Sequence, residues 1–141
     1  MKFTLNAINA QVIESYKEFL RQRLDKAVML PFKKVMVNGQ APKANNCHEN
    51  SQIYESENSN YDCIRGWLVV DGGNLNSEVI LLAHSVVRDT VNMDTYEITP
   101  IYSLEPRPFL ESYLTEEEYF TLYQYLAQKT YDVKLIINKF K

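Results

Sequence analysis

The sequence predicts an α+β fold in which N-terminal, central and C-terminal helices accompany a mainly antiparallel sheet of four or five strands. Two observations predict this class. Apolar residues recur at helical spacing near both ends, and apolar runs bounded by turn-forming residues fill the middle. A length of 141 residues suits one hydrophobic core. We therefore expect a single domain over residues 1–141.

The first predicted element is an amphipathic helix over residues 9–27, with Asn9 as its cap. Its apolar residues are spaced to lie on one helix face: Val12, Ile13, Tyr16, Leu20 and Leu24. Pro31, the Asn38-Gly39 pair and Pro42 then interrupt the chain. This stretch is expected to be loop, with at most one short strand at residues 35–37.

A short polar helix is predicted over residues 46–57. Asn45 and Asn46 are both residues that cap helices well, and Glu49 suits the positive N-terminal end. The helix has few apolar residues, so packing alone does not explain it.

Three strands are expected next, over residues 62–70, 78–88 and 95–102, with a turn at residues 71–74. Each run is rich in β-branched or aromatic residues and ends at polar turn residues. Their order predicts an antiparallel meander.

The C-terminal part begins where Pro106 and Pro108 break the chain. Thr115 and Glu118 have the spacing of a capping box and open a helix. A last strand is predicted over residues 131–140. Its residues alternate, with Val133, Leu135 and Ile137 on one face and Asp132, Lys134 and Ile136 on the other.

Charge and composition exclude several classes of protein. The net charge of -3 and a pI near 5.4 argue against a nucleic-acid-binding surface, which needs clustered Lys and Arg. No apolar run approaches the roughly 18 residues of a membrane span, and no signal-type stretch follows Met1. The two cysteines do not resemble a secreted disulfide framework. We expect a cytoplasmic protein that contacts neither membrane nor nucleic acid.

Cys47 is the best candidate for a chemically active residue. It falls at the predicted helix start, where free N–H groups and the helix dipole favour the thiolate. A nucleophilic thiol needs a base, and the chain has two histidines. His48 adjoins Cys47 on a helix, where neighbours point about 100° apart. His84 breaks an apolar strand pattern and is therefore predicted to be the base.

Glu97 is the candidate that would orient His84. If the hairpin pairs Arg88 with Thr95, His84 faces Thr99 and Glu97 lies one diagonal step away on the same sheet face. The three residues would then fill the roles of nucleophile, base and orienter. A slip of one residue would move Glu97 to the other face.

This order of nucleophile at a helix start, then strands with His and an acidic residue, resembles the core of papain-like and transglutaminase-like thiol enzymes. The stretch 46–109 also resembles small bacterial and phage proteins of unassigned function. The similarity rests on short motifs: Cys47-His48-Glu49-Asn50, Gly66-Trp67, His84-Ser85-Val86-Val87 and Glu97-Ile98-Thr99-Pro100. In that pattern the residue matching Glu97 is more often Asp.

The resemblance implies a papain-like arrangement and an oxyanion site made by the Cys47 N–H and an upstream amide. Spacing does not choose among the amide candidates, which are Gln40, Asn45 and Asn46. Candidates for substrate binding in the similar stretch are Asn50, Trp67 and Thr99. A strand Trp equally suits a core.

The leading hypothesis is a cysteine hydrolase or acyltransferase that acts on a peptide, protein or small amide and uses no cofactor or metal. Peptidase, deamidase, amidase and transferase share an acyl-enzyme and are not separated by the sequence. A zinc site at Cys47, His48, Cys63 and His84 lacks any regular ligand spacing. The alternative is a non-enzymatic phage or bacterial binding or inhibitor protein with an acidic, tyrosine-rich surface, which includes Tyr113, Tyr119, Tyr123 and Tyr125. Oligomeric state is not indicated.

Overall fold

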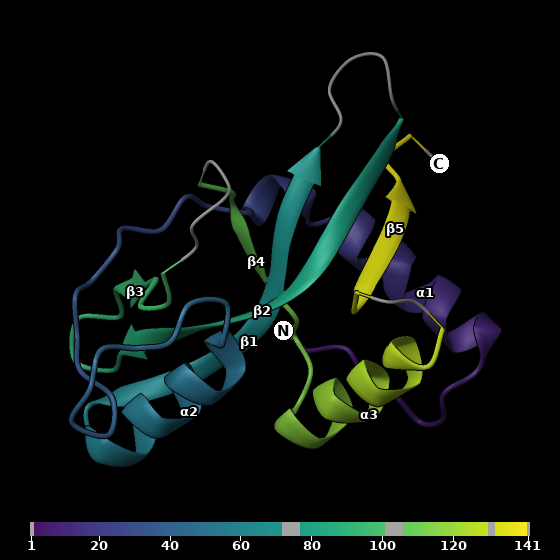
Figure 1. The fold of residues 1–141 in the computed structure, drawn as a ribbon. Helices are drawn as coiled ribbons and strands as arrows, with labels where there is room; N and C mark the ends of the chain where they lie inside the picture. Colours follow the sequence, from purple (N-terminus) through teal and green to yellow (C-terminus); the bar gives the residue numbers. More distant parts are fainter. Residues whose placement is uncertain (1, 72–76, 101–105, 130–131, 141) are drawn as a thin grey trace. The chain divides into compact units, whose positions relative to one another are not determined.

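The computed structural model describes residues 2–71, 77–100, 106–129 and 132–140, and its fold is α+β (Figure 1). Within these residues it has three α-helices, one 3-10 helix and a five-stranded antiparallel sheet. The helical elements are α1 (Ala10–Arg21), η1 (Leu24–Lys26), α2 (Cys47–Glu57) and α3 (Glu116–Ala127). The strands are β1 (Tyr61–Asp71), β2 (Glu78–Asp89), β3 (Thr95–Tyr96), β4 (Phe109–Glu111) and β5 (Lys134–Asn138). The predicted fold class is confirmed.

Strand β2 organises the sheet, whose order is β3-β2-β1-β4, with β5 also paired to β2. The first part of β2 pairs with β5, from Glu78 opposite Asn138 to Leu82 opposite Lys134. Its last part pairs with β3, where Arg88 lies opposite Thr95. His84 therefore lies between two stretches of β2 that have different partners.

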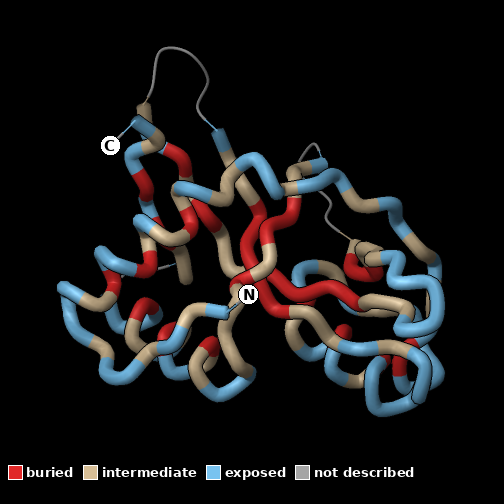
Figure 2. Tube along the Cα trace, turned by 180° about the vertical axis from the view of Figure 1, so that it is seen from behind, coloured by how far each residue is buried: buried red, intermediate tan, exposed pale blue. Residues whose placement is uncertain are grey.

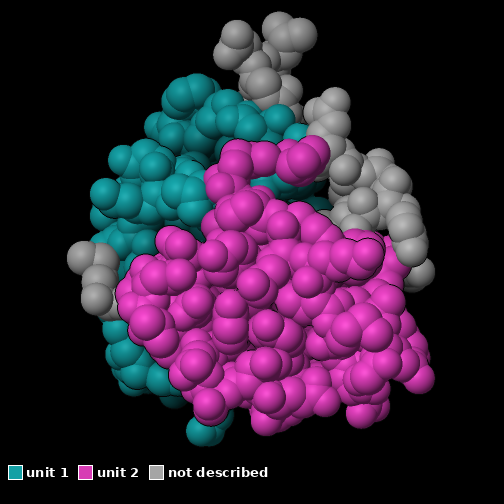
Figure 3. All heavy atoms as spheres, turned by 90° about the vertical axis from the view of Figure 1, so that its left-hand side faces the viewer, with its two compact units in different colours: residues 1–28, 66–83, 107–141 teal, residues 29–65, 84–106 magenta. Residues whose placement is uncertain are grey.

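Contacts group the chain into two compact units, coloured separately in Figure 3. Unit 1 consists of Met1–Val28, Gly66–Ala83 and Arg107–Lys141. Unit 2 consists of Met29–Arg65 and His84–Pro106. The boundaries fall inside β1 and β2, so the same two strands supply residues to both units. The expectation of a single domain stays a prediction.

Unit 1 contains the larger hydrophobic core; Figure 2 colours buried positions red. The buried members of this core come from α1, α3 and four strands: Ile13, Tyr16, Leu20, Trp67, Val79, Leu81, Leu110, Tyr119, Leu122, Leu126, Leu135 and Ile137. The polar atoms of Trp67 and Tyr16 form hydrogen bonds within this unit. Trp67 Nε1 donates to Tyr16 Oη at 3.0 Å, and Tyr16 Oη donates to the Ser112 carbonyl at 2.7 Å. Trp67 is thus a core residue.

Gly66 is required by the close approach of β4. A Cβ at this position would lie 2.3 Å from the Leu110 carbonyl oxygen and 2.6 Å from the Phe109 ring. Tyr119 Oη also donates to the Gly66 carbonyl at 2.8 Å. Any side chain here would separate β1 from β4.

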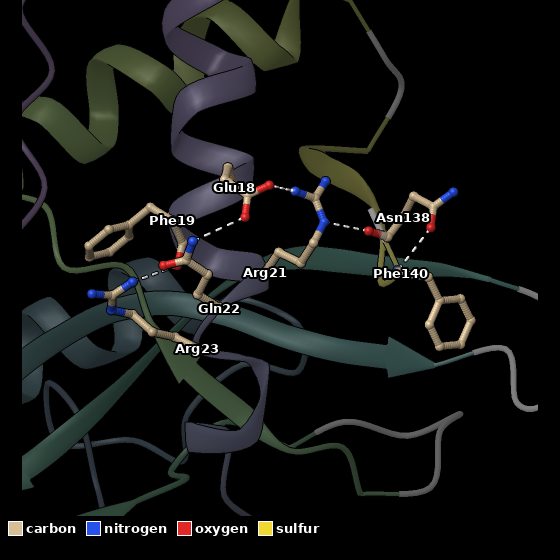
Figure 4. Close-up of polar contacts among 7 residues, drawn as sticks. All are labelled: Glu18, Phe19, Arg21, Gln22, Arg23, Asn138 and Phe140. Carbon is tan, nitrogen blue, oxygen red and sulfur yellow. Dashed lines mark hydrogen bonds and ion pairs between the residues drawn. The ribbon is translucent and has the colours of Figure 1, made fainter.

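Helix α1 begins as predicted, because the Asn9 side chain accepts from the Val12 N–H at 2.9 Å. It ends at Arg21, earlier than expected, and the chain continues as η1. One of the last carbonyls of the helix, that of Phe19, accepts from the Arg23 side chain at 2.8 Å (Figure 4). Arg21 donates instead to the Asn138 carbonyl at the end of β5. Glu18 pairs with Arg21 and thereby holds it in place.

Unit 2 has a smaller apolar cluster, made by four buried residues: Val37, Tyr54, Val87 and Ile98. Helix α2 packs along the first half of β1. The Tyr54 and Tyr61 rings meet edge to face at 5.0 Å, and the Glu55 carboxylate accepts from the Cys63 N–H at 2.8 Å. Most of its other buried side chains are polar, and several of them form the site described below.

The predicted α2, β1, β2 and Thr115 capping box agree with the structure within a residue or two. The alternation expected in the last strand is also confirmed, because Leu135 and Ile137 are buried and Ile136 is exposed. Among the described residues, β3 is only two residues long, and residues 35–37 form no strand. Strand β4 was not expected. The predicted turn at 71–74 and the ends of two predicted strands, at 101–102 and 131, lie partly or wholly outside the described residues.

Candidate functional site

Cys47 is the first residue of α2, as the sequence predicts. Its backbone N–H is one of those at a helix start that have no carbonyl partner within the helix. Asn46 is the cap residue, but its side chain makes no capping hydrogen bond, so the first turn is left without a side-chain cap. Cys47 is 8% exposed. The thiol is therefore largely shielded from water and close to the positive end of a helix.

The Cys47 thiol contacts the His84 imidazole, which is 4% exposed. Burial alone would raise the pKa of Cys47, but the hydrogen bonds and charge of His48 and His84 outweigh it and lower that pKa to about 6. Burial would lower the pKa of His84, but the hydrogen bonds and charge of Cys47 and Glu97 raise it to about 9. Between these values the pair exists as thiolate and imidazolium.

Glu97 contacts the other side of the His84 ring. The predicted pairing of Arg88 with Thr95 is observed, and the Glu97 Oε1 lies 2.5 Å from His84 Nε2. The second carboxylate oxygen accepts from the Thr99 N–H at 3.0 Å. The Glu97 carboxylate is therefore held between the His84 ring and the backbone of Thr99.

The backbone of Glu97 is held by a segment far away in the sequence. Its N–H donates to the Pro31 carbonyl at 3.0 Å, and its carbonyl accepts from the Lys33 N–H at 2.8 Å. Phe32 and Glu97 thereby form an isolated parallel β-bridge. This segment fixes the carboxylate that faces His84.

His48 is a fourth residue of the site, and the sequence argument set it aside. Its side chain hydrogen-bonds to Cys47, in spite of the expectation that neighbours on a helix are poorly aimed at each other. Its Nδ1 lies 2.5 Å from Ser85 Oγ, and buried Arg65 donates to the same oxygen at 3.0 Å. Arg65, a charged residue in the middle of the predicted strand 62–70, was the signal that could have revealed this network.

The three candidates for an oxyanion amide differ in placement. Gln40 is exposed and pairs through its backbone with Val37. Asn45 is exposed and has a left-handed backbone, with φ 60°. Asn46 is half-buried, directly precedes Cys47 and has the uncapped side chain described above. Asn46 is therefore the best placed of the three.

The candidates for substrate binding are all buried in their units. Asn50 and Thr99 are 2% and 1% exposed and bond to each other, with Asn50 Nδ2 3.1 Å from Thr99 Oγ1. Asn50 also donates to the Lys43 carbonyl at 2.9 Å. Trp67 belongs to the core of unit 1. These contacts give the three side chains structural partners, and their part in substrate binding stays a prediction.

In the described parts of the chain, no three His, Cys, Asp or Glu side chains are grouped to hold a metal ion. Cys63 is half-buried on β1. No helix in the same residues has the length and apolar character to cross a membrane.

Tyr119 is buried and the other three tyrosines of the expected surface are half-buried, so their rings contribute mainly to packing.

Comparison with known proteins gives no relative for this site. No protein-family model matches the chain, and no curated protein or solved structure matches it significantly. The functional argument therefore rests on the geometry of Cys47 and its neighbours.

Proposed function

We propose that the protein is a cysteine hydrolase or acyltransferase with Cys47 as nucleophile, His84 as general base and acid, and Glu97 as the residue that orients His84. One observation carries this proposal. A helix-start thiol contacts an imidazole whose far nitrogen lies 2.5 Å from a carboxylate. Nucleophile, base and orienter are the three roles that acyl transfer requires.

In the first step, the Cys47 thiolate attacks the carbonyl carbon of an amide or ester, and its electron pair forms the carbon–sulfur bond. The carbonyl electrons move to oxygen, where the Cys47 N–H at the start of α2 can donate to the oxyanion. Asn46 is the side-chain candidate for a second donor. The oxyanion collapses, the bond to the leaving group breaks, and the His84 imidazolium gives that group its proton.

In the second step, the neutral His84 takes a proton from water or from an acceptor amine, which attacks the thioester carbon. Collapse of this second adduct expels the Cys47 thiolate and restores the thiolate–imidazolium pair. Glu97 keeps the His84 ring oriented and stabilises its positive charge in both steps. Hydrolase and transferase differ only in the acceptor.

The order of elements supports the resemblance to papain-like thiol enzymes as part of this proposal. The nucleophile begins α2, the base lies on β2, and the carboxylate follows β3. Glu97 reaches His84 with the longer side chain of Glu where that pattern more often has Asp. A carboxylate or amide at this place is needed only to hold the imidazole, so the longer residue can serve.

An acyl-enzyme assay tests the proposal directly. A panel of activated peptidyl, aminoacyl and short-chain acyl esters is incubated with the protein, and intact mass spectrometry follows the chain. We expect one acyl group on Cys47, with release that requires His84. The Cys63→Ala variant is the matched control, because it removes the other thiol and should acylate normally.

Two results would overturn the proposal. One is acylation of Cys63→Ala at no more than the rate of a free thiol peptide. The other is an unchanged rate of acylation in a folded His84→Gln variant. Circular dichroism of each variant separates loss of chemistry from loss of fold.

A further inference from the structure

The segment that precedes Cys47 differs in charge from the rest of the chain. Residues 29–46 contain three lysines and no Asp or Glu, whereas the whole chain has a net charge of -3. Phe32 and Met36 in this segment are each 57% exposed. Large apolar side chains that are exposed close together mark a surface that a partner can cover. The lysines make an acidic partner the best complement.

One backbone edge of this segment is paired, and the other is not. The segment runs beside β3 (Figure 1), where the Pro31 carbonyl and the Lys33 N–H bond to the backbone of Glu97 at 3.0 and 2.8 Å. Because the main-chain groups of successive residues in an extended segment point to opposite edges, those of Phe32 and Lys34 point away from Glu97. In the parts of the chain that the structure describes, neither Phe32 nor Lys34 has a backbone hydrogen bond. A free strand edge therefore begins at Phe32.

The side chains of the same segment alternate between two faces. Val37 is buried in the apolar cluster of unit 2, and Val35 packs against that cluster. Phe32, Lys34 and Met36 alternate with them and are exposed. We call these three exposed residues, together with their free backbone edge, the docking edge.

The two neighbouring lysines have different surroundings. Lys33 Nζ lies 5.9 Å from the centroid of the Tyr61 ring and 5.3 Å from that of the Tyr96 ring, so its charge is held against aromatic faces. Lys34 is exposed and has no ion pair among the described residues. Lys34 is thus the cation that an approaching chain meets. The Glu57 carboxylate accepts from the Asn38 N–H, beyond the docking edge.

We propose that the docking edge binds an extended, acidic stretch of a polypeptide substrate by strand addition. Hydrogen bonds to the free main-chain groups supply affinity, and side-chain pairs supply specificity. An acidic residue opposite Lys34, with apolar residues two positions away on either side to face Phe32 and Met36, matches both the charge and the alternation. This inference deepens the proposed function by naming its substrate class and rests on that function for the reaction.

The docking edge is linked to the proposed catalytic residues through Glu97. The paired edge of the segment holds the Glu97 backbone, and the Glu97 carboxylate faces His84. Strands pair at a spacing of about 5 Å, so a docked chain lies about 10 Å from the Glu97 backbone. The docked stretch is therefore an anchor, and the carbonyl that reacts comes from another part of the same substrate chain.

Peptide binding tests the docking edge without any reaction. The probe is a short fluorescent peptide in which Leu, Glu and Phe alternate with Thr, and the protein is the full chain with Cys47→Ala to prevent turnover. Fluorescence anisotropy measures the dissociation constant. We expect saturable binding that becomes about threefold to tenfold weaker when Lys replaces the Glu of the peptide or when the protein has Lys34→Glu.

Two matched controls change the same kinds of side chain in unit 1. Lys129→Glu makes the same charge change at an exposed position and should leave peptide binding unchanged. Phe32→Ser should weaken binding about threefold to tenfold, whereas Phe140→Ser, at a position that is 80% exposed, should not. The absence of saturable binding below about 1 mM, or equal losses in the control variants, would overturn the proposal.

Hydrogen exchange measured by nuclear magnetic resonance tests strand addition itself. The amide hydrogens of Phe32 and Lys34 should exchange at least about tenfold more slowly when the peptide is saturating than in the free protein. Peptide binding that leaves both exchange rates unchanged would mean that the peptide does not pair with this edge, and the proposal would fail. It would fail equally if ultracentrifugation showed a dimer that Lys34→Glu dissociates, or if a single-stranded oligonucleotide bound more tightly than the peptide.

The outcome is separable from that of the proposed function. If Cys47 forms no acyl-enzyme but the peptide binds and slows exchange at the docking edge, the proposed reaction fails and the docking edge stands as a peptide-binding site. If an acyl-enzyme forms but the peptide does not bind, the reaction stands and the docking edge fails.

Discussion

The two units of the chain bury different kinds of side chain. Among the described residues, the core cluster of unit 1 has twelve buried members, whereas that of unit 2 has four. Buried polar side chains show the opposite distribution. Six of the seven belong to unit 2, namely Asn50, Ser51, Arg65, His84, Ser85 and Thr99, and Ser112 alone belongs to unit 1.

The difference indicates where stability and where chemistry are located. Buried apolar area stabilises a fold in proportion to its extent, so unit 1 has the greater share of hydrophobic stabilisation. Buried polar groups contribute little net stability and are costly when unpaired, so a concentration of them needs another explanation. In unit 2 these groups surround or lie near Cys47, and the proposed acyl transfer gives that explanation. The predictions below change one unit at a time.

The largest effect on stability is expected for Trp67→Ala in unit 1. Removing this buried ring leaves a cavity and takes away the donor to the Tyr16 hydroxyl oxygen, which should cost about 3–5 kcal/mol of unfolding free energy. Urea denaturation followed by circular dichroism measures the loss. Gln124→Ala, an exposed position on α3, is the control and should change stability by no more than about 0.5 kcal/mol. A loss below that of an ordinary surface change would contradict the assignment of Trp67 to the core.

Asn50→Ala in unit 2 should have a smaller effect. It leaves Thr99 and the Lys43 carbonyl without their amide donor, so we expect a loss of about 1–3 kcal/mol. Alkylation of Cys47 in the folded variant should stay near the wild-type rate. A large change in acyl-transfer rate with unchanged stability would instead support the substrate-binding role that the sequence predicts for Asn50.

Much of the fold follows from the sequence because its signals are local. Asn9, the Thr115 capping box and the apolar alternation of residues 133–137 each act over a few residues, and each is observed. The hairpin register also follows, and it brings Glu97 to His84.

What the sequence did not predict depends on long-range contacts. Strand β4 has three residues between Pro108 and Ser112, which is too short to show a periodic pattern. It forms because it pairs with β1, where Gly66 lies opposite Glu111. The hydrogen bond from the Lys33 N–H to the Glu97 carbonyl joins two segments whose sequences give no sign that they pair. His48 was set aside because its position next to Cys47 on the helix was weighed without Ser85 and Arg65, which come from two other strands.

Glu97→Gln sharpens the account of unit 2. Loss of the carboxylate charge should lower the pKa of His84, and with it the stabilisation of the thiolate. We expect iodoacetamide to label Cys47 about threefold to tenfold more slowly near pH 6, with stability changed by less than in Asn50→Ala. Labelling at the wild-type rate would show that Glu97 is a plain structural carboxylate.

The smallest expected effect is the contribution of the Cys47–His84 pair to the pH dependence of stability. Because folding lowers the pKa of Cys47, its thiolate contributes stability that is fully present at pH values above the pKa of the unfolded thiol. This stability is lost as the pH falls through about 6. The raised pKa of His84 gives stability that is present below 6.5 and is lost as pH rises through about 9. Between about pH 6.5 and 8.5 the two slopes oppose each other and cancel.

Wild type and a Cys47→Ala, His84→Gln double variant should therefore show parallel curves of unfolding free energy against pH over that range. Urea denaturation at several pH values measures both curves. A difference in slope between them would mean that only one member of the pair has a shifted pKa.

The most direct test of the central claim is the pH dependence of Cys47 alkylation in the Cys63→Ala background. The account predicts a rate that rises with a midpoint near pH 6, because the thiolate is the reactive form and His48 and His84 stabilise it. In His84→Gln the midpoint should move up by about one unit or more. A wild-type midpoint near the 8.5 of a free cysteine, or a thiol that iodoacetamide does not reach in the folded protein, would contradict the claim that Cys47 is an activated nucleophile.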